Sequence, residues 1–271
     1  MLKKIPIKTL YPLALAEGEG VGTAYEYYAK RLLLHRWLAN SEPPRRILVA
    51  GLPQKYGASM DFLLLAAELD ADLTILDDRA SAIARCKAAL EETQKNGSMT
   101  NLNPVFLITQ DISNFPEISG HFDLGLSSEV LQRLPIEVRL DYMSKTVQLA
   151  SRFALFTPNG DNPSHTNLSG LDGLQLGELQ QLAGGALEST PTPTPAASAG
   201  KSLLTGYIDM PPFPPGMIRT DDQREHASTG RGEALAMWGL SYYARMEQWL
   251  PRSWRRTKSH IVYSFLDSFQ R

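Results

Sequence analysis

The sequence predicts an α/β fold built on a doubly wound, mostly parallel sheet of about seven strands. Between residues 46 and 156, five short apolar runs alternate with segments of helical periodicity. The first run, 46–50, lies between Pro44 and Gly51, as is typical of a buried strand. Strands that alternate with helices indicate βαβ units, whose right-handed crossovers bring the carboxyl ends of the strands to one ligand-binding edge.

The N-terminal segment, 1–42, is expected to be irregular at first and then helical. Residues 1–22 contain prolines early and glycines later. Thr23 and Glu26 have the spacing of a capping box, so we predict that a helix starts there and runs to about Leu38. Two prolines then end the connection to the first strand.

The central segment, 43–160, is predicted to carry five strands and three helices. The strands are expected at 46–50, 73–76, 104–109, 122–126 and 152–156, and the helices at 60–69, 80–95 and 137–150. Beyond this segment we expect a helix at 171–182, a flexible Pro-rich insertion at 184–232, a helix at 233–250 and a last strand at 260–265. The chain, 1–271, is interpreted as a single domain.

Composition excludes several classes of function. With 43% hydrophobic and 21% charged residues, the chain has enough apolar side chains for a large core. The formal net charge of −2 gives no electrostatic reason to expect a nucleic-acid partner. Cys86 is the single cysteine, which rules out an intrachain disulfide or a Cys-rich metal site and suits a cytoplasmic protein. The sequence contains no run of about 18 apolar residues, so no membrane-spanning helix is predicted.

Two glycines flank the turn after the first predicted strand. Gly51 follows the strand directly, and a glycine there lets a ligand approach the backbone beside Leu52. Gly57 leads into the next helix, whose N-terminal amides could face a polar group of a ligand. Many α/β proteins keep such a turn for packing alone, so the turn by itself does not decide the function.

Acidic residues follow the second and third predicted strands. Asp77 lies about 25 residues after Gly51, where nucleotide-binding folds place an acid that accepts hydrogen bonds from ribose. Asp78 is the better candidate to cap the next helix, which would leave Asp77 to the ligand. Asp111 could accept a hydrogen bond from an exocyclic amine while Ile112 packs on a flat ring. The alternative for Asp111 is an Asx-turn.

The fourth predicted strand brings Ser127, Ser128 and Glu129 to the same edge, unless Ser128 caps a short helix instead. In their order and spacing, these features over residues 23–160 resemble the class I S-adenosylmethionine-dependent methyltransferases. The fourth segment is the most specific, because that family often shows Phe-Asp-Leu, two residues, Ser-Ser-Glu-Val-Leu, two residues and Leu-Pro.

The resemblance implies a Rossmann-like fold, S-adenosylmethionine as cofactor, and an in-line methyl transfer that depends on positioning a small-molecule acceptor and excluding water. By analogy, the methionine part of the cofactor would lie beside Gly51 and Gly57, and its ribose would bind to Asp77. The adenine would lie at Asp111 and Ile112, and residues 127–129 would line the inner edge of the cofactor.

Three positions depart from the family pattern. Val49 stands where the family has an acid, Pro53 where it has the middle glycine of the turn, and Arg133 where it often has a histidine. A second interpretation is therefore a non-catalytic, methyltransferase-like binding protein without cofactor affinity. A third, an NAD-dependent oxidoreductase, is disfavoured because the chain lacks Gly-x-Gly-x-x-Gly after the first strand.

The remaining candidates lie beyond the fifth strand. His165 is our first choice as a general base, ahead of Asn159 and Asp161, and the alternative is a solvated loop histidine. We interpret Asp209–Gly216 as a rigid Pro-rich loop that could cover the acceptor pocket. Residues 249–258, rich in Trp and Arg, are interpreted as a solvated loop, with weak peripheral membrane contact as the alternative and no stable insertion.

Overall fold

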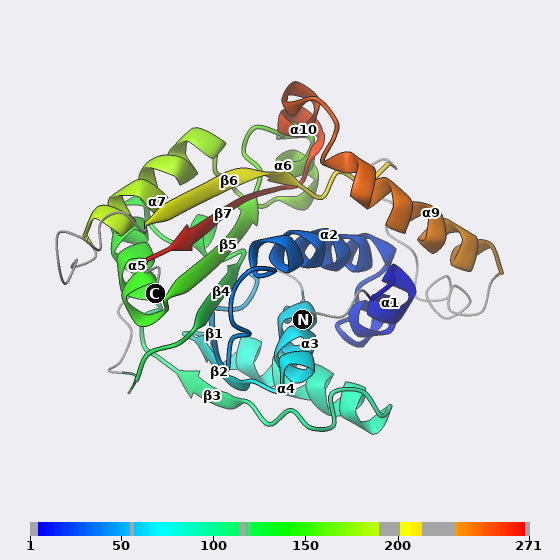
Figure 1. Ribbon diagram of the computed structural model, residues 1–271, viewed down its shortest axis with the longest axis horizontal. Helices are drawn as coiled ribbons and strands as arrows, with labels where there is room; N and C mark the ends of the chain where they lie inside the picture. The colour runs from blue at the N-terminus through cyan, green and yellow to red at the C-terminus, as the bar shows by residue number, and fades with distance from the viewer. Residues whose placement is uncertain are drawn as a thin grey trace.

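The computed structural model describes residues 5–54, 57–113, 118, 120–189, 201–212 and 231–268, with backbone alone at 168 and 231–236. Seven strands form one sheet in the order β3-β2-β1-β4-β5-β7-β6 (Figure 1). Their bounds are β1 Arg46–Ala50, β2 Asp72–Asp77, β3 Val105–Ile108, β4 Leu124–Ser128, β5 Arg152–Pro158, β6 Ser202–Ile208 and β7 Ile261–Asp267. Neighbours from β3 to β5 pair in parallel, whereas β7 is antiparallel to β5 and β6. The predicted doubly wound sheet is confirmed.

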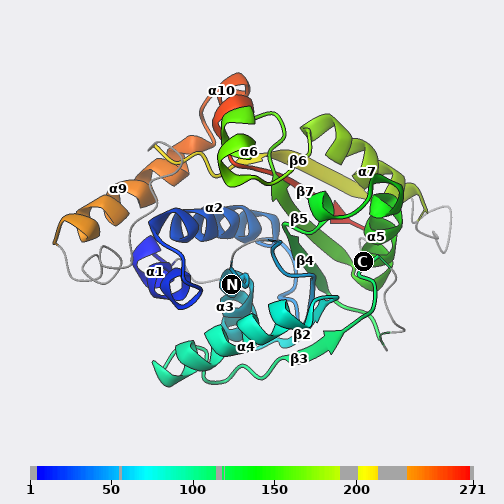
Figure 2. The ribbon, with the colours of Figure 1, turned by 180° about the vertical axis from the view of Figure 1, so that it is seen from behind.

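Helices cover both faces of the sheet (Figures 1 and 2). One apolar core lies under α1 Ile7–Ala16, α2 Val21–Trp37, α3 Met60–Leu69, α4 Ala80–Lys95 and α9 Arg231–Glu247. The other lies under α5 Ile136–Leu149 and α7 Leu176–Ser189. Three short helices, η1 Leu131–Arg133, α6 Pro163–Ser169 and α10 Arg252–Lys258, complete the described elements. None of the described helices is both long and apolar enough to cross a bilayer.

The N-terminal segment is more ordered than predicted. Residues 7–16 form α1 although Pro12 lies inside it, because one side of that helix, including Ile7 and Leu10, is buried in the core. The predicted capping box is wrong: α2 begins at Val21, and its N-cap residue, Gly20, has no side chain to cap the helix. Thr23 lies within the first turn of α2, and its hydroxyl donates to Glu19 over 3.5 Å.

The C-terminal part also corrects the sequence prediction. Residues 184–189 belong to α7, 202–208 form β6, and 252–258 form α10 rather than a loop. Strand β6 pairs along its whole length with β7, so tertiary pairing defines it despite a locally weak signal. The strand predicted at 122–126 is shifted to 124–128, and Phe122 makes an isolated bridge to Ala150. Most of the predicted insertion, including 190–200 and 213–230, lies outside the described residues.

Candidate functional site

Strands β1, β2 and β4 end at one edge of the sheet, and Gly51 starts the turn that leaves this edge. Its amide donates to the carbonyl of Leu76 over 2.7 Å, which ties the turn to the end of β2. Its φ is +89°, a conformation that favours glycine. A Cβ on Gly51 would lie 2.6 Å from a methyl carbon of Val130, so glycine is required here both for conformation and for space.

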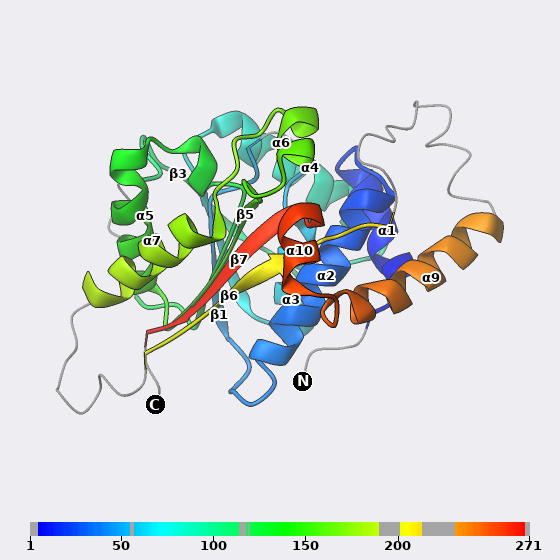
Figure 3. The same ribbon diagram turned by 90° about the horizontal axis from the view of Figure 1, so that it is seen from above.

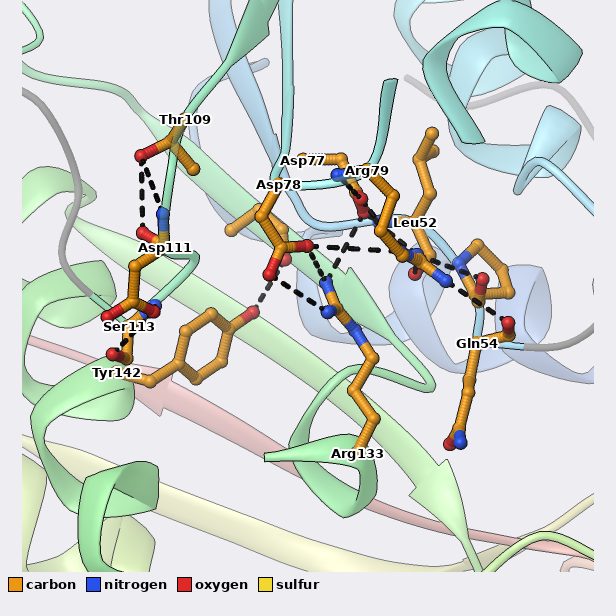
Figure 4. A network of polar contacts seen from close by, with 12 residues as sticks. Leu52, Gln54, Asp77, Asp78, Arg79, Thr109, Asp111, Ser113, Arg133 and Tyr142 are labelled. Atoms are coloured by element: carbon orange, nitrogen blue, oxygen red, sulfur yellow. Dashed lines mark hydrogen bonds and ion pairs between the residues drawn. The ribbon is translucent and has the colours of Figure 1, made fainter. Parts of the chain in front are cut away.

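Asp77 is the centre of a dense polar network at this edge (Figure 4). Its side chain is fully buried, and it accepts hydrogen bonds from the Leu52 amide at 2.7 Å and from the Arg79 amide at 2.8 Å. The Arg79 guanidinium adds bonds of 2.9 Å to each carboxylate oxygen. Burial alone would raise the pKa of Asp77, but the hydrogen bonds from Arg79 and Leu52 hold that pKa below its usual value.

The expectation that Asp78 caps the next helix and leaves Asp77 available is wrong. Asp77 itself accepts from the amide at the start of α4, whereas Asp78 pairs with Arg133, Nη2 to Oδ1, over 2.9 Å. Arg133 also lies 3.5 Å from Oδ2 of Asp77. Two arginines therefore stand beside the carboxylate that was predicted to bind ribose.

Arg79 also holds the turn after β1. Its guanidinium donates to the carbonyls of Leu52 at 2.7 Å, Pro53 at 3.1 Å and Gln54 at 3.1 Å. One side chain thus links three successive carbonyls of the turn to Asp77. These charge-assisted bonds stabilise the turn, in which Pro53 stands where the family has its middle glycine.

The carboxylate of Glu17, a residue between α1 and α2, lies at the N-terminus of α3. This carboxylate accepts from the Met60 amide at 2.8 Å and, in closer contacts, from the Ala58 amide and the Tyr27 hydroxyl. A Cβ on Gly57 would lie 2.5 Å from Oε2 of Glu17. Burial raises the pKa of Glu17 to about 7, although these hydrogen bonds oppose the shift. The amides that were predicted to face a ligand are thus bonded to the chain's own carboxylate.

The segment after β3 shows the Asx-turn that the sequence left as an alternative. Oδ1 of Asp111 accepts from the Ser113 amide at 2.8 Å and from the Ser113 hydroxyl at 2.7 Å. Ile112 is fully buried in the core under α5 and α7. Asp111 is exposed, so one residue of this predicted pair faces solvent and the other packs inside the protein.

The serines after β4 are also engaged within the protein. The Ser127 hydroxyl lies 2.7 Å from the Tyr142 hydroxyl, which donates to the carbonyl of Ala50 at 2.5 Å. Ser128 caps no helix; it accepts from the Lys30 ammonium at 2.8 Å, so that predicted alternative is wrong. Lys30 is buried above the rings of Phe62 and Phe156, where it connects α2 to the end of β4.

Glu129 differs from its neighbours. Its φ is +55°, unusual for a residue other than glycine, and strained backbone of this kind is often found at functional sites. Within the described part of the chain, its carboxylate forms no hydrogen bond or ion pair. Burial, followed by the charge of Glu26, raises its pKa to about 8. Glu129 is therefore a predicted site residue whose carboxylate remains available for a ligand.

A histidine pair that the sequence did not predict lies where β5, β6 and β7 meet. Nδ1 of His260 lies 3.2 Å from Oδ2 of the buried Asp209, and the His260 ring stacks on His165 with centroids 4.1 Å apart. Burial and the nearby His260 lower the pKa of His165 to about 4. His260 was missed because only the antiparallel course of β7 brings the start of that strand to this edge.

The other candidates beyond β5 have structural contacts. Asn159 donates to the carbonyls of Arg256 and Ser259, each over 2.8 Å. Asp161 accepts from the Tyr207 hydroxyl at 2.9 Å and pairs with Arg256. Both residues therefore join α10 to the sheet. No group of three or more potential metal ligands occurs among the described residues.

S-adenosylmethionine can be tested against this geometry. The carboxylate expected at the ribose is bonded to Leu52 and Arg79, and the amides expected at the methionine part are bonded to Glu17. Val49, at the position of the family's acid, is fully buried in an apolar core. With the side chains in these positions, the residues do not fit the cofactor.

Comparison with solved structures identifies the architecture. The methyltransferase domain of a bacterial Hen1 superposes with a TM-score of 0.51 at 11% identity, over 91% of this chain and 98% of that one. The fold is that of the class I methyltransferases. The small RNA methyltransferase HEN1 gives a TM-score of 0.52 at 12% identity, over 88% of this chain and 25% of that longer chain. The sequence matches no model of a known protein family and no curated protein.

Proposed function

We propose that this chain is an S-adenosylmethionine-dependent methyltransferase. Its own side chains, Arg79 and Glu17, are bonded to the groups expected to bind the cofactor, so the cofactor binds only after they move. The observation that carries the proposal is the position of Asp77. In the class I methyltransferase fold, this acid ends β2 beside the glycine turn, and here it is bonded to that turn through the Leu52 amide. Asp77 supports the proposal because it stands where that fold binds ribose, and the proposal explains why Arg79 and Arg133 lie beside its carboxylate when no cofactor is bound.

The proposal requires both blocking side chains to move. Arg79 is about a quarter exposed; it pairs with Asp77, lies 3.8 Å from Asp78, and donates to carbonyls of the turn after β1. Glu17 lies between α1 and α2, outside both helices. With its pKa near 7, it exchanges a proton at neutral pH, and its protonated form binds the α3 amides less strongly. A ligand carboxylate would compete for the same amides.

Calorimetric titration with S-adenosylmethionine, S-adenosylhomocysteine and NAD tests this proposal. Substituting Arg79→Ala removes the guanidinium from both oxygens of Asp77 and leaves the two backbone amide bonds in place. We expect binding of the first two ligands to tighten by about tenfold, equivalent to one charge-assisted hydrogen bond. Arg79→Lys keeps the charge but cannot hold three carbonyls, so it should give an intermediate effect. Arg85→Ala, an exposed arginine on the adjacent α4, is the matched control and should leave binding unchanged.

A second candidate function is supported by a specific observation. The buried Val49, the Arg79–Asp77 pair and the Glu17 cap together replace the contacts that the family makes to its cofactor. A methyltransferase-like binding protein without cofactor affinity would have this arrangement permanently. If neither the unaltered chain nor the folded Arg79 and Glu17→Gln variants bind S-adenosylmethionine or S-adenosylhomocysteine at millimolar concentration, the first proposal is wrong and this second one holds.

We propose a small-molecule acceptor rather than RNA. The electrostatic neighbours of Glu129 include Glu26, Glu19 and Asp209, with Lys30 as the opposing charge. This acidic surrounding repels a polyphosphate chain. In the titration, single-stranded RNA at saturating concentration should not change the affinity for S-adenosylhomocysteine. Competition by RNA would contradict the assignment of the acceptor.

A further inference from the structure

We propose that the outer face of α9 and α10 is a docking surface for an anionic lipid membrane. Part of this face, the aromatic stripe, consists of Trp238, Tyr242 and Met246 on α9 and Trp249 just beyond it, whose side chains are 71%, 61%, 47% and 86% exposed. The spacing of four residues places the first three on one side of α9, and Trp249 is the second residue after the helix ends. Large apolar side chains rarely gather in such exposed rows without a partner.

The stripe is not needed to hold α9 on the protein. The opposite side of the helix supplies the packing, through the buried Met237, Leu240 and Ala244. Glu247 on that side accepts from the Tyr25 hydroxyl over 2.6 Å, which fixes the end of α9 against α2. The outer side chains are therefore surplus to the fold, and Figures 1 and 3 show α9 at the margin of the molecule.

Helix α10 continues this surface and adds positive charge. Trp254 is 61% exposed, so three of the four tryptophans of the chain are exposed between residues 238 and 254. Arg252 and Lys258 are exposed beside it. From residue 237 to 258 there are five basic residues, and Glu247, the one acid of the segment, is only 2% exposed. Among residues 237–258 the surface thus combines exposed tryptophans with cations and exposes no negative side chain.

This combination matches the chemistry of an anionic lipid surface. Trp and Tyr partition into the region of the lipid headgroups, and Arg and Lys are attracted to anionic headgroups. The stripe runs along a convex helix, whereas proteins that bind single-stranded nucleic acid stack the bases in a basic groove. A twofold contact with a second copy would bring the same unneutralised cations face to face. A lipid bilayer is therefore the partner that the surface fits best.

Vesicle sedimentation tests the inference with the full chain. We expect binding to vesicles of phosphatidylcholine with about 30% phosphatidylserine, weaker binding to phosphatidylcholine alone, and loss of binding in high salt. The three exposed tryptophans should show a blue-shifted fluorescence emission on binding. The variant Arg252→Glu/Lys258→Glu should weaken binding by about tenfold or more, since each charge contributes about fivefold. Trp249→Ala/Trp254→Ala should weaken it by about tenfold or more as well, because two exposed rings that partition into the headgroup region are removed.

Matched controls alter exposed residues elsewhere. Ile136→Ala removes an apolar side chain that is 72% exposed on α5, and Arg85→Glu reverses a charge on α4; both should bind vesicles like the unaltered chain. The inference is overturned if anionic vesicles do not bind, or if the tryptophan variants bind them normally. It is also overturned if this face instead binds single-stranded RNA, or forms a dimer that the same substitutions abolish. These readouts do not require cofactor binding.

Discussion

Arg79 and Asp77 form a two-pronged ion pair within the first turn after β2, although only one residue separates them. Nε of Arg79 lies 2.9 Å from Oδ1, and Nη2 lies 2.9 Å from Oδ2. This geometry satisfies both carboxylate oxygens with parallel charge-assisted bonds. Since the same guanidinium binds the carbonyl of Leu52, the pair also fixes the turn that follows β1.

The first prediction concerns the buried carboxylate. In Asp77→Asn, Arg79 and Arg133 lose the buried carboxylate and keep only Asp78 as a counter-charge, and we expect the free energy of unfolding to fall by about 3 kcal/mol at pH 7. The folded pKa of Asp77 is lowered, so its contribution is present above the unfolded pKa of about 3.9 and is lost as the pH falls through the folded value. Urea unfolding at several pH values measures the difference.

Asp72→Asn is the control for this experiment. Asp72 lies at the exposed start of the same strand, so the substitution should change the unfolding free energy by less than about 0.5 kcal/mol. If Asp77→Asn is equally harmless, or if its effect persists well below pH 3, the carboxylate is not a source of stability in the way described here.

The second prediction concerns the close approach at Gly51. Gly51→Ala places a Cβ 2.6 Å from Val130 and forces a side chain onto a residue with φ of +89°. The strain and the overlap together should lower the unfolding free energy by about 3 kcal/mol. Gly18→Ala isolates the strain, because Gly18 has a φ of +78° with nothing within 4 Å of the added carbon. It should cost about 1 kcal/mol, and equal losses in the two variants would contradict the steric argument.

The central elements could be predicted from the sequence because their signals are local. Helices 60–69 and 80–95 appear with the predicted bounds, since apolar periodicity and end signals lie within each segment. Helix α1 could not be predicted, because burial of its apolar side outweighs the cost of Pro12. Strand β6 depends on its pairing with β7, which lies more than fifty residues later in the chain.

The candidate site was predictable in position but not in its contacts. The places of Gly51 and Asp77 follow from the alternation of strands and helices, which a sequence displays. The Glu17 carboxylate reaches the Ala58 amide across 41 residues, and Lys30 reaches Ser128 across 98. Such contacts depend on how the N-terminal helices dock. A single sequence carries no local signal for them.

The third prediction concerns the pH dependence of stability. Burial raises the pKa of Glu247 to about 7, although the Tyr25 hydroxyl and other contacts oppose the shift. Because the folded pKa exceeds the unfolded one, the contribution of this group is complete below about pH 4.5 and is lost as the pH rises through 7. The loss corresponds to about 3 kcal/mol. Urea unfolding between pH 4.5 and 8 should therefore show declining stability.

Glu247→Gln keeps an oxygen for the Tyr25 hydroxyl and removes the titration. The decline in the unfolding free energy between pH 4.5 and 8 should become shallower. The unfolding free energy of the variant should therefore rise relative to that of the unaltered chain as the pH rises. Glu17 and Glu129 also titrate in this range, so the difference between the two proteins is the informative quantity. The exposed Glu91→Gln should reproduce the original slope, and an unchanged slope in Glu247→Gln would refute the prediction.

The fourth prediction concerns the histidine pair. Burial lowers the pKa of His260, but the hydrogen bond and the charge of Asp209 outweigh it and raise that pKa above its usual value. In Asp209→Asn both effects weaken, so the His260 pKa should fall, although the charges of Glu26 and Glu247 still raise it. NMR titration of the imidazole resonances measures the change, and His165→Ala and His260→Ala assign the two rings by the loss of a signal.

The stacked partner gives an independent check on this assignment. Burial is the main cause of the low pKa of His165, about 4, and the charge of His260 adds to it. His260 is still protonated at the pH where His165 titrates, so in Asp209→Asn the His260 titration should move while the His165 pKa stays low. Asp172→Asn, an exposed substitution beyond α6, should move neither. If both histidines shift together, a general loss of packing and not the removal of the Asp209 charge explains the change.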